Sequence, residues 1–303
     1  MTLRPSPVHN SGIALRLLSV ALITAMSAVV HGAAQSVPIG QLIFWRSLIA
    51  ILPIVIYIAL CGQISTAFYT RNPRAHAERG LFGVVTMALS FVSLAYLPVA
   101  NASALAYLAP LMSLPMAAMI LKERLSISVI LACTLGFSGV ILMLISSLQS
   151  PTSQWSQYIG IAAGLGYAVM MGVLRVHIKA MTATETPATI AFYFAVIGAV
   201  LGALSALWGW AALTPETLLL LVLAGLLGGM AHIATAEAVA RAPVSTLAPF
   251  DYTGMVWALG FDIVLFNTMP DIWSGLGVMA ILAAAMLAIR ADIRPSTAAR
   301  TGR

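Results

Sequence analysis

Asp251 is a carboxylate in a stretch of sequence that is otherwise almost entirely apolar. It stands in the segment APFDYTG, residues 248–254, two positions after Pro249. A buried acid is costly unless it faces water or a partner, and the proline frees a backbone carbonyl that also needs a polar neighbour. Two roles are open. The carboxylate binds a cationic substrate group or a proton in a wet cavity, or it caps the turn that the proline kinks.

Four further polar side chains interrupt apolar runs and are candidates for the wall of the same cavity. His232, as a neutral imidazole, would hydrogen-bond a substrate or link two helices. Tyr107, Tyr167 and Tyr252 need partners for their hydroxyl groups when buried, and either a substrate or a neighbouring helix supplies one. The sequence has no HExxH pattern and no second histidine one turn from His232. Neither a metal site nor a cofactor is therefore predicted.

Three charged residues are candidates for structural or coupling roles. Arg46 and Asp262 fall at depths in two apolar segments that allow an ion pair, although nothing in the sequence brings those segments together. The alternative for Arg46 is that its long stem carries the charge toward the membrane surface. Glu123, in LKERLS at 121–126, is by itself a charge in a solvated turn.

The composition indicates what kind of element must position these residues. Of the 303 residues, 61% are hydrophobic and 8% are charged, whereas a soluble domain carries about 25% charged residues. A water-soluble fold of this length cannot hide so much apolar surface, so the chain is expected to lie in a lipid bilayer. The net charge of +6 comes from basic residues scattered singly between apolar runs. That distribution is typical of membrane topology signals, and no nucleic-acid partner is predicted.

A transmembrane helix needs about 20 predominantly apolar residues, and ten segments meet this requirement. They are 13–32, 39–60, 81–97, 100–121, 126–147, 158–178, 187–208, 216–240, 244–266 and 272–290. With the amino terminus in the cytoplasm, every Lys and Arg except Arg46 falls on the cytoplasmic side, including those of RNPRAHAERG in the loop 61–80. The positive-inside rule therefore favours an all-α integral membrane fold with ten helices and both termini cytoplasmic. The first segment also resembles a signal-peptide core, and its removal would leave nine helices.

The order of the segments suggests two halves of five helices. Because five is odd, a second copy of such a unit enters the membrane in the opposite orientation. The fourth and ninth segments each hold a proline near ANASALAYLAP or VSTLAP, and Pro110 and Pro249 are expected to kink these helices. We therefore expect inverted repeats at 1–148 and 156–303, as in secondary transporters. Three glycine pairs are expected to allow close helix packing: Gly160/Gly164, Gly198/Gly202 and Gly225/Gly229.

Three stretches carry a resemblance to a known family. They are FWR at 44–46, Pro110 with LKERLS at 121–126, and GGMAHIATAEAVARAPVSTLAPFDYTGMVWA at 228–258. Over nearly its whole length the chain resembles the EamA type of the drug/metabolite transporter superfamily. The resemblance implies export of amino acids, metabolites or drugs, import in some members, and a clasp role for Glu123. The family's FGExP pattern reads FNTMP here, with Thr268 in place of the acid, so no role that needs acids at both equivalent points is predicted.

These features together predict a secondary transporter of the bacterial inner membrane, and no enzyme. We expect it to export amino acids or related metabolites by alternating access through a central cavity. A wall of Tyr, Met and Ala with one acid also suits molecules with an amine, so an organic-cation or multidrug exporter is the first alternative. An integral-membrane enzyme and a channel are the others, but the sequence has no Ser/His/Asp set, paired carboxylates or Walker motif. One carboxylate and one histidine permit proton coupling.

Overall fold

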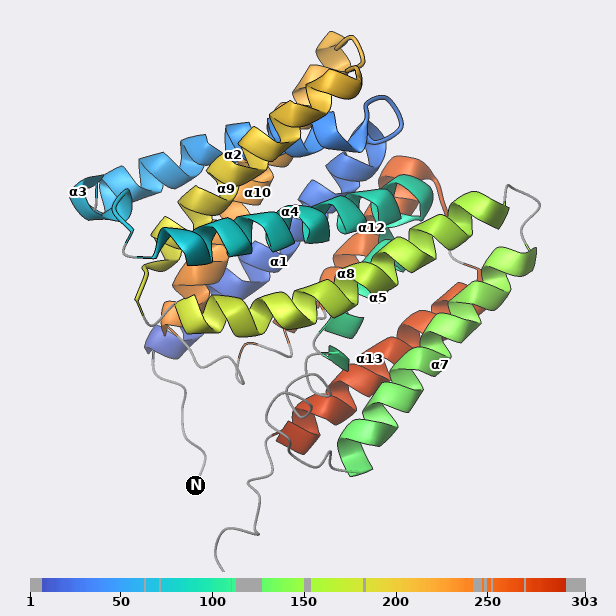
Figure 1. The fold of residues 1–303 in the computed structure, drawn as a ribbon. Coiled ribbons are helices and arrows are strands. Elements are labelled where there is room, and N and C mark those ends of the chain that lie inside the picture. The colour runs from blue at the N-terminus through green and yellow to red at the C-terminus, as the bar shows by residue number, and fades with distance from the viewer. Residues whose placement is uncertain are drawn as a thin grey trace, which may run out of the picture.

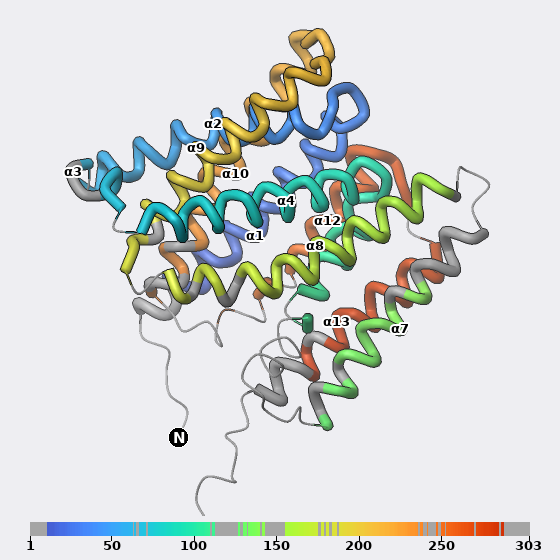
Figure 2. Tube along the Cα trace, viewed as in Figure 1, coloured from blue at the N-terminus to red at the C-terminus, as the bar shows by residue number. Residues whose placement is uncertain are grey.

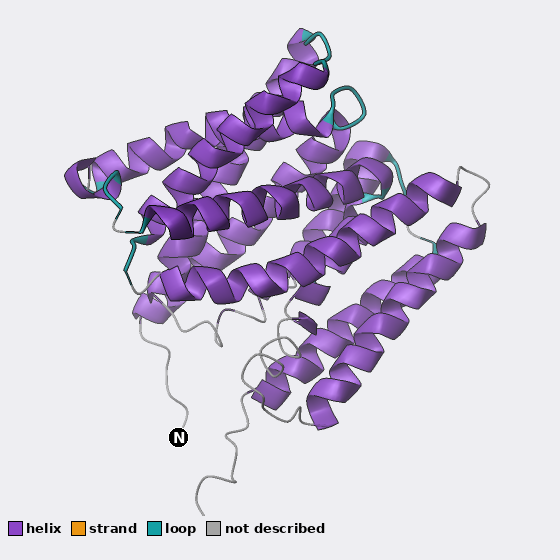
Figure 3. Cartoon of the chain, in the orientation of Figure 1, coloured by secondary structure: helices purple, strands orange, loops and turns teal. Residues whose placement is uncertain are grey.

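The computed structural model describes residues 7–62, 64–70, 72–109, 111–112, 127–149, 154–181, 184–241, 247, 250–251, 253–269 and 271–292. Within these ranges all regular structure is helical (Figure 3). The helices are α1 (Pro7–Ala33), α2 (Ile39–Leu60), α3 (Ile64–Ala67), α4 (Pro73–Tyr96), α5 (Val99–Ala106), α7 (Ile127–Gln149), α8 (Gln154–Met181), α9 (Pro187–Leu204), the 3-10 turn η1 (Ser205–Trp208), α10 (Pro215–Arg241), α12 (Thr253–Phe266) and α13 (Ile272–Asp292). Four residues of the sequence analysis lie outside the described ranges: Pro110, Glu123, Pro249 and Tyr252.

Each of the ten expected segments contains a helix, but several helix boundaries differ from the expectation, and those of α5 and α4 differ most near the site. The helix of the fourth expected segment, α5, is described only as far as Ala106, whereas the segment was expected to run to residue 121. The helix α4 begins at Pro73 and not near residue 81, because Asn72 caps it: the Asn72 side chain accepts a hydrogen bond of 3.3 Å from the Ala75 N–H. Proline in the first turn of a helix loses no hydrogen bond. The assignment of RNPRAHAERG to a loop was therefore wrong from Pro73 onward.

The helices have the length and the surface of membrane segments. Within the part of the chain that the structure describes, six are long and apolar enough to cross a membrane, namely Ser11–Ala33, Ile39–Leu60, Pro73–Tyr96, Trp155–Leu174, Ala188–Trp208 and Pro215–Thr235, and two shorter apolar helices follow them. Large apolar side chains face outward from several elements: Leu52 of α2 is 56% exposed and Val264 of α12 is 79% exposed. Such a surface is stable in lipid, which is as apolar as these side chains.

The long helices pack in pairs, and these pairs lie side by side from one edge of the molecule to the other. α2 and α9 lie together at one edge, and α7 and α13 lie together at the opposite edge (Figures 1 and 2). Between these edges, α1 packs along α10, and α4 packs along α8. The short helix α5 contacts both α8 and α12 near the middle of the bundle. Helices far apart in the sequence therefore surround one central region.

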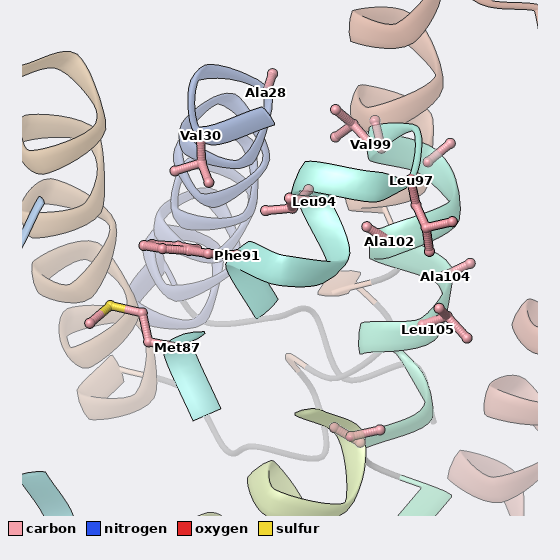
Figure 4. Close-up of a cluster of buried hydrophobic side chains, with 14 of the residues drawn as sticks. Ala28, Val30, Met87, Phe91, Leu94, Leu97, Val99, Ala102, Ala104 and Leu105 are labelled. Carbon is pink, nitrogen blue, oxygen red and sulfur yellow. The ribbon is translucent and has the colours of Figure 1, made fainter. Parts of the chain in front are cut away.

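The largest cluster of buried apolar side chains joins α1, α4 and α5. Phe91 and Leu94 of α4 are 2% and 3% exposed, and Val99 and Leu105 of α5 are fully buried. Figure 4 shows Phe91 beside Val30 of α1, with Val99 and Leu105 on the other side of the turn between α4 and α5. Because the surrounding lipid is itself apolar, close packing and not release from water stabilises this cluster.

The expected close packing at the glycine pairs is confirmed. A Cβ added at Gly202 of α9 would lie 2.6 Å from the backbone nitrogen of Phe44 in α2, and one at Gly229 of α10 would lie 2.9 Å from the Ala50 carbonyl oxygen. On α8, a Cβ at Gly164 would lie 2.9 Å from the Ser93 hydroxyl of α4. These helices approach so closely that a methyl group does not fit between them. The glycines thus hold α2, α9 and α10 together around the central region.

Asp262 of α12 caps the start of α5. Its two carboxylate oxygens accept hydrogen bonds from the Val99 N–H at 2.9 Å and the Ala100 N–H at 2.6 Å, and the residue is 2% exposed. The first amides of a helix have no partner within the helix, and an anion at this end also meets the positive end of the helix dipole. The ion pair between Asp262 and Arg46 that the sequence allowed is not formed, because Asp262 has these backbone partners.

We expect Asp262→Asn to destabilise the protein. The amide keeps only one acceptor oxygen, so one buried backbone N–H loses its partner, at a cost of about 1–3 kcal/mol. Thermal unfolding of the purified protein in detergent measures the effect. Glu216→Gln, at an exposed position in the first turn of α10, serves as the control for removal of a carboxylate. Equal unfolding temperatures for the two variants would contradict the capping role.

Candidate functional site

A cavity of about 310 Å³ lies in the middle of the helix bundle. Side chains of α1, α2, α4, α5, α8, α9 and α10 line it, together with Asp251 before α12. Most of the lining is apolar, which is typical of small-molecule sites that use a few placed polar groups for orientation. The charged and aromatic residues of the wall are Arg16, Arg46, Arg79, Phe91, Tyr107, Tyr167, Phe194, His232 and Asp251.

Asp251 lies on the cavity wall, but it already has a partner. Its Oδ1 atom forms an ion pair with the Nε of Arg16 in α1. The side chains of Arg16 and Asp251 are only 17% and 19% exposed. The attraction between the two charges offsets part of the cost of removing each of them from water. Neither of the two roles expected from the sequence included this arginine, because the pair joins residues 235 positions apart.

Arg46 of α2 bonds to His232 of α10. The Nη2 atom of Arg46 lies 3.0 Å from the Nε2 atom of His232. An arginine can only donate hydrogen bonds, so Nε2 must be the acceptor and the imidazole is neutral with its proton on Nδ1. His232 therefore holds the guanidinium of Arg46 against the cavity. Sequence reasoning offered a helix link as one role of His232, and this bond is such a link.

Arg79 of α4 is a cavity residue that the sequence analysis missed. Its guanidinium carbon lies 4.3 Å from the centre of the Phe194 ring in α9, and that of Arg46 lies 6.0 Å from the same centre. A cation within about 6 Å of an aromatic face is attracted to it. The signal that could have found Arg79 is the Asn72–Pro73 helix start, since it places Arg79 two turns inside α4.

The two arginines have no acidic partner in the described part of the chain. They are only 5% and 8% exposed, and the Nε of Arg46 and the Nε and Nη1 of Arg79 have no hydrogen-bond partner. The described carboxylates have other partners or an exposed position: Glu78 with Arg74, Glu185 with Thr70, Glu237 with Arg241, Asp251 with Arg16, Asp262 with α5, Asp271 with the Ser274 N–H, and Glu216 exposed on α10. The Arg16–Asp251 pair cancels, so Arg46 and Arg79 leave the cavity with an excess of positive charge.

Tyr107 and Tyr167 also line the cavity and are partly buried. Tyr107 follows α5 and reaches α12, because a Cβ added at Gly254 would overlap its hydroxyl group. The cavity thus brings together five of the predicted residues, which are Asp251, His232, Tyr107, Tyr167 and Arg46. Among the described residues, no three His, Cys, Asp or Glu side chains gather in a group that could hold a metal ion.

The amino-acid sequence is similar to those of known transporters. The chain is 26% identical over 265 residues to the pseudopaline exporter CntI of Pseudomonas aeruginosa, covering 86% of this chain and 90% of that protein. It is 28% identical over 260 residues to a riboflavin transporter of Rhizobium johnstonii, covering 85% and 83%. It is 25% identical over 251 residues to an S-adenosylmethionine uptake transporter of Rickettsia prowazekii, covering 82% and 81%.

One solved crystal structure shares the fold. It superposes with a TM-score of 0.65 at 21% sequence identity, over 95% of this chain and 99% of that one. The sequence profile of the EamA-like transporter family matches residues 10–145 and again residues 158–290. With its apolar helices and exposed apolar surface, the chain is a membrane protein, and it belongs to the EamA-like transporter family.

Proposed function

We propose that this protein is a secondary transporter that moves a small metabolite through the central cavity by alternating access. The observation that carries the proposal is the cavity itself, which lies among seven helices and has charged groups on an otherwise apolar wall.

Amino acids and related metabolites are the proposed substrates, because a carboxylate fits a cavity with excess positive charge. Export is the proposed direction, which the likeness to the pseudopaline exporter supports. The same excess of positive charge disfavours the organic-cation alternative.

The proposed architecture is ten transmembrane helices in two inverted halves. The family profile matches once in each half of the chain. When the two halves are exchanged, α1 corresponds to α8, α2 to α9, and α4 to α10. The α1–α10 pair then corresponds to the α8–α4 pair, and the α2–α10 pair corresponds to the α9–α4 pair. The two helices of each of these four pairs pack against each other. The α2–α9 and α7–α13 pairs are each their own counterpart under this exchange. These relations support a two-fold axis in the membrane plane, as in other transporters with inverted repeats.

In the proposed mechanism, contacts at the two ends of the cavity open in turn. With the amino terminus in the cytoplasm, the Arg16–Asp251 pair between α1 and the start of α12 closes the inner end. Asp262 joins α12 to α5 at the outer end. Both contacts link the first half of the chain to the second. Alternating access requires that one of them opens while the other remains closed.

We expect counterflow when the purified protein is reconstituted in liposomes. Uptake of a labelled amino acid should accelerate when the same unlabelled compound is loaded inside, because the loaded carrier returns faster than the empty one. An enzyme or a channel gives no such acceleration. Liposomes without protein are the control. A flux that does not respond to internal substrate would argue against a carrier.

Both termini are expected in the cytoplasm of a bacterial cell. A reporter enzyme that is active only in the periplasm should be inactive when fused after Arg303 and active when inserted near Ser153. The physical reason is the distribution of basic residues, which resist transfer across the membrane. Activity at Arg303 together with inactivity at Ser153 would overturn the proposed orientation.

The Arg16–Asp251 pair should show strong coupling in a double-mutant cycle. Asp251→Asn and Arg16→Gln each leave one charge unpaired in the cavity, whereas the double variant leaves none. We expect the double variant to be more stable than the sum of the single effects predicts, by about 0.5–3 kcal/mol. Thermal unfolding in detergent measures this energy. Strictly additive effects would mean that the pair contributes nothing as a closed contact.

A further inference from the structure

Arg46 and Arg79 are two buried positive charges for which the described chain supplies no carboxylate. We propose that these two arginines form the binding seat for a carboxylate of the transported molecule. The substrates are then organic anions and zwitterions with an apolar body, and organic cations are excluded. This inference rests on the proposed transport function and assigns the chemical class of its substrate.

The geometry points to a seat with two sides. Both guanidinium groups lie over the ring of Phe194, with the carbon of Arg79 4.3 Å and that of Arg46 6.0 Å from its centre, so both charges lie near the same side chain of the cavity wall. The Nε of Arg46 and the Nε and Nη1 of Arg79 are buried and have no hydrogen-bond partner within the described chain, so the protein itself leaves both charges uncompensated. A guanidinium presents its donors as a rigid fork that matches the two oxygens of a carboxylate. The arginines come from α2 and α4, so a carboxylate that binds both of them would bridge two helices.

Neighbouring residues make room for these guanidinium groups. A Cβ added at Gly83 of α4 would overlap Nη1 of Arg79. A Cβ added at Gly228 of α10 would lie 3.0 Å from both Nε and Nη2 of Arg46. His232 accepts a hydrogen bond from Nη2 of Arg46, and Phe194 attracts both cations. These neutral partners hold the arginines in position but leave their charge uncompensated.

The charge of the cavity decides between substrate classes. A cation in the cavity would meet two unpaired positive charges, and the acid that could attract it, Asp251, is already paired with Arg16. An anion removes the repulsion between Arg46 and Arg79 and gains charge-assisted hydrogen bonds to both. A zwitterion is accepted through its carboxylate. This reverses the sequence-based expectation that Asp251 binds a substrate amine.

The first experiment measures the charge of the cavity without any substrate. Met26 is the position for a reporter thiol, because its sulfur lies 3.9 Å from Nη2 of Arg46. Met26→Cys is introduced after Cys61 and Cys133 are replaced by serine. The thiol is then treated with an anionic sulfonatoethyl and a cationic trimethylammonioethyl methanethiosulfonate. We expect the anionic reagent to react faster, and the ratio of the two rates to fall about tenfold in Arg46→Gln or in Arg79→Gln.

Arg74→Gln is the matched control for this measurement. Arg74 is on the same helix as Arg79, but its side chain is 89% exposed and paired with Glu78. Its substitution should leave the rate ratio unchanged. A cationic reagent that reacts as fast as the anionic one, or a ratio that Arg46→Gln and Arg79→Gln do not alter, would overturn the seat.

The second experiment measures counterflow for three probes with the same phenyl body. These are 3-phenylpropionate as the anion, phenylalanine as the zwitterion and phenethylamine as the cation. We expect counterflow of the first two compounds. The counterflow rate should fall at least about tenfold in Arg46→Gln and in Arg79→Gln. It should be unchanged in Arg74→Gln. Counterflow of phenethylamine that is independent of both arginines overturns the inference and leaves the transport function standing. If no probe exchanges, the transport function fails with these compounds, and the thiol experiment still decides the charge of the seat.

Protein stability separates a binding seat from a structural role. Replacing an unpaired buried charge by a neutral amide removes a desolvation cost, so Arg79→Gln should unfold at the same or a higher temperature than the native protein. A structural arginine would give the opposite result. Loss of counterflow together with lower stability in Arg79→Gln, and no recovery in Arg79→Lys, would assign this residue to the fold and contradict its role in the seat.

Discussion

The cost of keeping a charge away from water determines how the interior of this protein is organised. An acid or base near the centre of a bilayer costs at least about 2.5–3.5 kcal/mol, so each buried charge needs a partner, a cavity or both. Asp251 has Arg16, and Asp262 has two backbone amides of α5. The contacts of Arg46 and Arg79 with described residues are to uncharged groups, including His232 and Phe194. The uncompensated charge of the described cavity wall is therefore concentrated at these two arginines.

Glycine has two separate effects in the same helices. At Gly202 and Gly229 the missing side chain lets α9 and α10 approach α2 directly, which brings the walls of the cavity together. At Gly83 and Gly228 the missing side chain leaves space that a guanidinium group occupies. Tight contacts between helices and open space for charged groups thus come from one residue type. Which effect a glycine has depends on whether its helix face meets a neighbouring backbone or the cavity.

The elements of the fold could be predicted from the sequence because their signals are local. Runs of apolar residues gave a helix in each of the ten expected segments, and the glycine pairs lie at the expected helix contacts. Part of the cavity wall was also predicted, including Asp251, His232, Tyr107 and Tyr167. These residues stand out in sequence because a polar group within an apolar run has a cost that needs a reason.

The sign of the charge in the cavity could not be predicted, because it depends on contacts between distant segments. Only the packing of α1 against α12 brings Arg16 next to Asp251, and this ion pair neutralises the acid. Arg79 was missed for a different reason. A basic residue near the expected end of a helix was taken as a topology signal, but the Asn72 cap extends α4 and carries the arginine into the cavity. Local cap chemistry therefore has to be weighed before basic residues are counted toward membrane orientation.

The partners of the buried charges also differ in how readily they can be exchanged. The carboxylate of Asp262 is held by backbone amides, which stay with α5 as long as that helix keeps its first turn. The Arg16–Asp251 contact joins two side chains that are each partly exposed, so water can replace either partner when the helices separate. The guanidinium groups of Arg46 and Arg79 rest on Phe194 and His232, and these uncharged partners compensate a positive charge only weakly. A ligand shifts a conformational equilibrium only by the difference in its affinity for the two states. Of these three sites, the Arg46 and Arg79 pair is stabilised most by an added anion. An anion that contacts both α2 and α4 would therefore favour one arrangement of those helices over another.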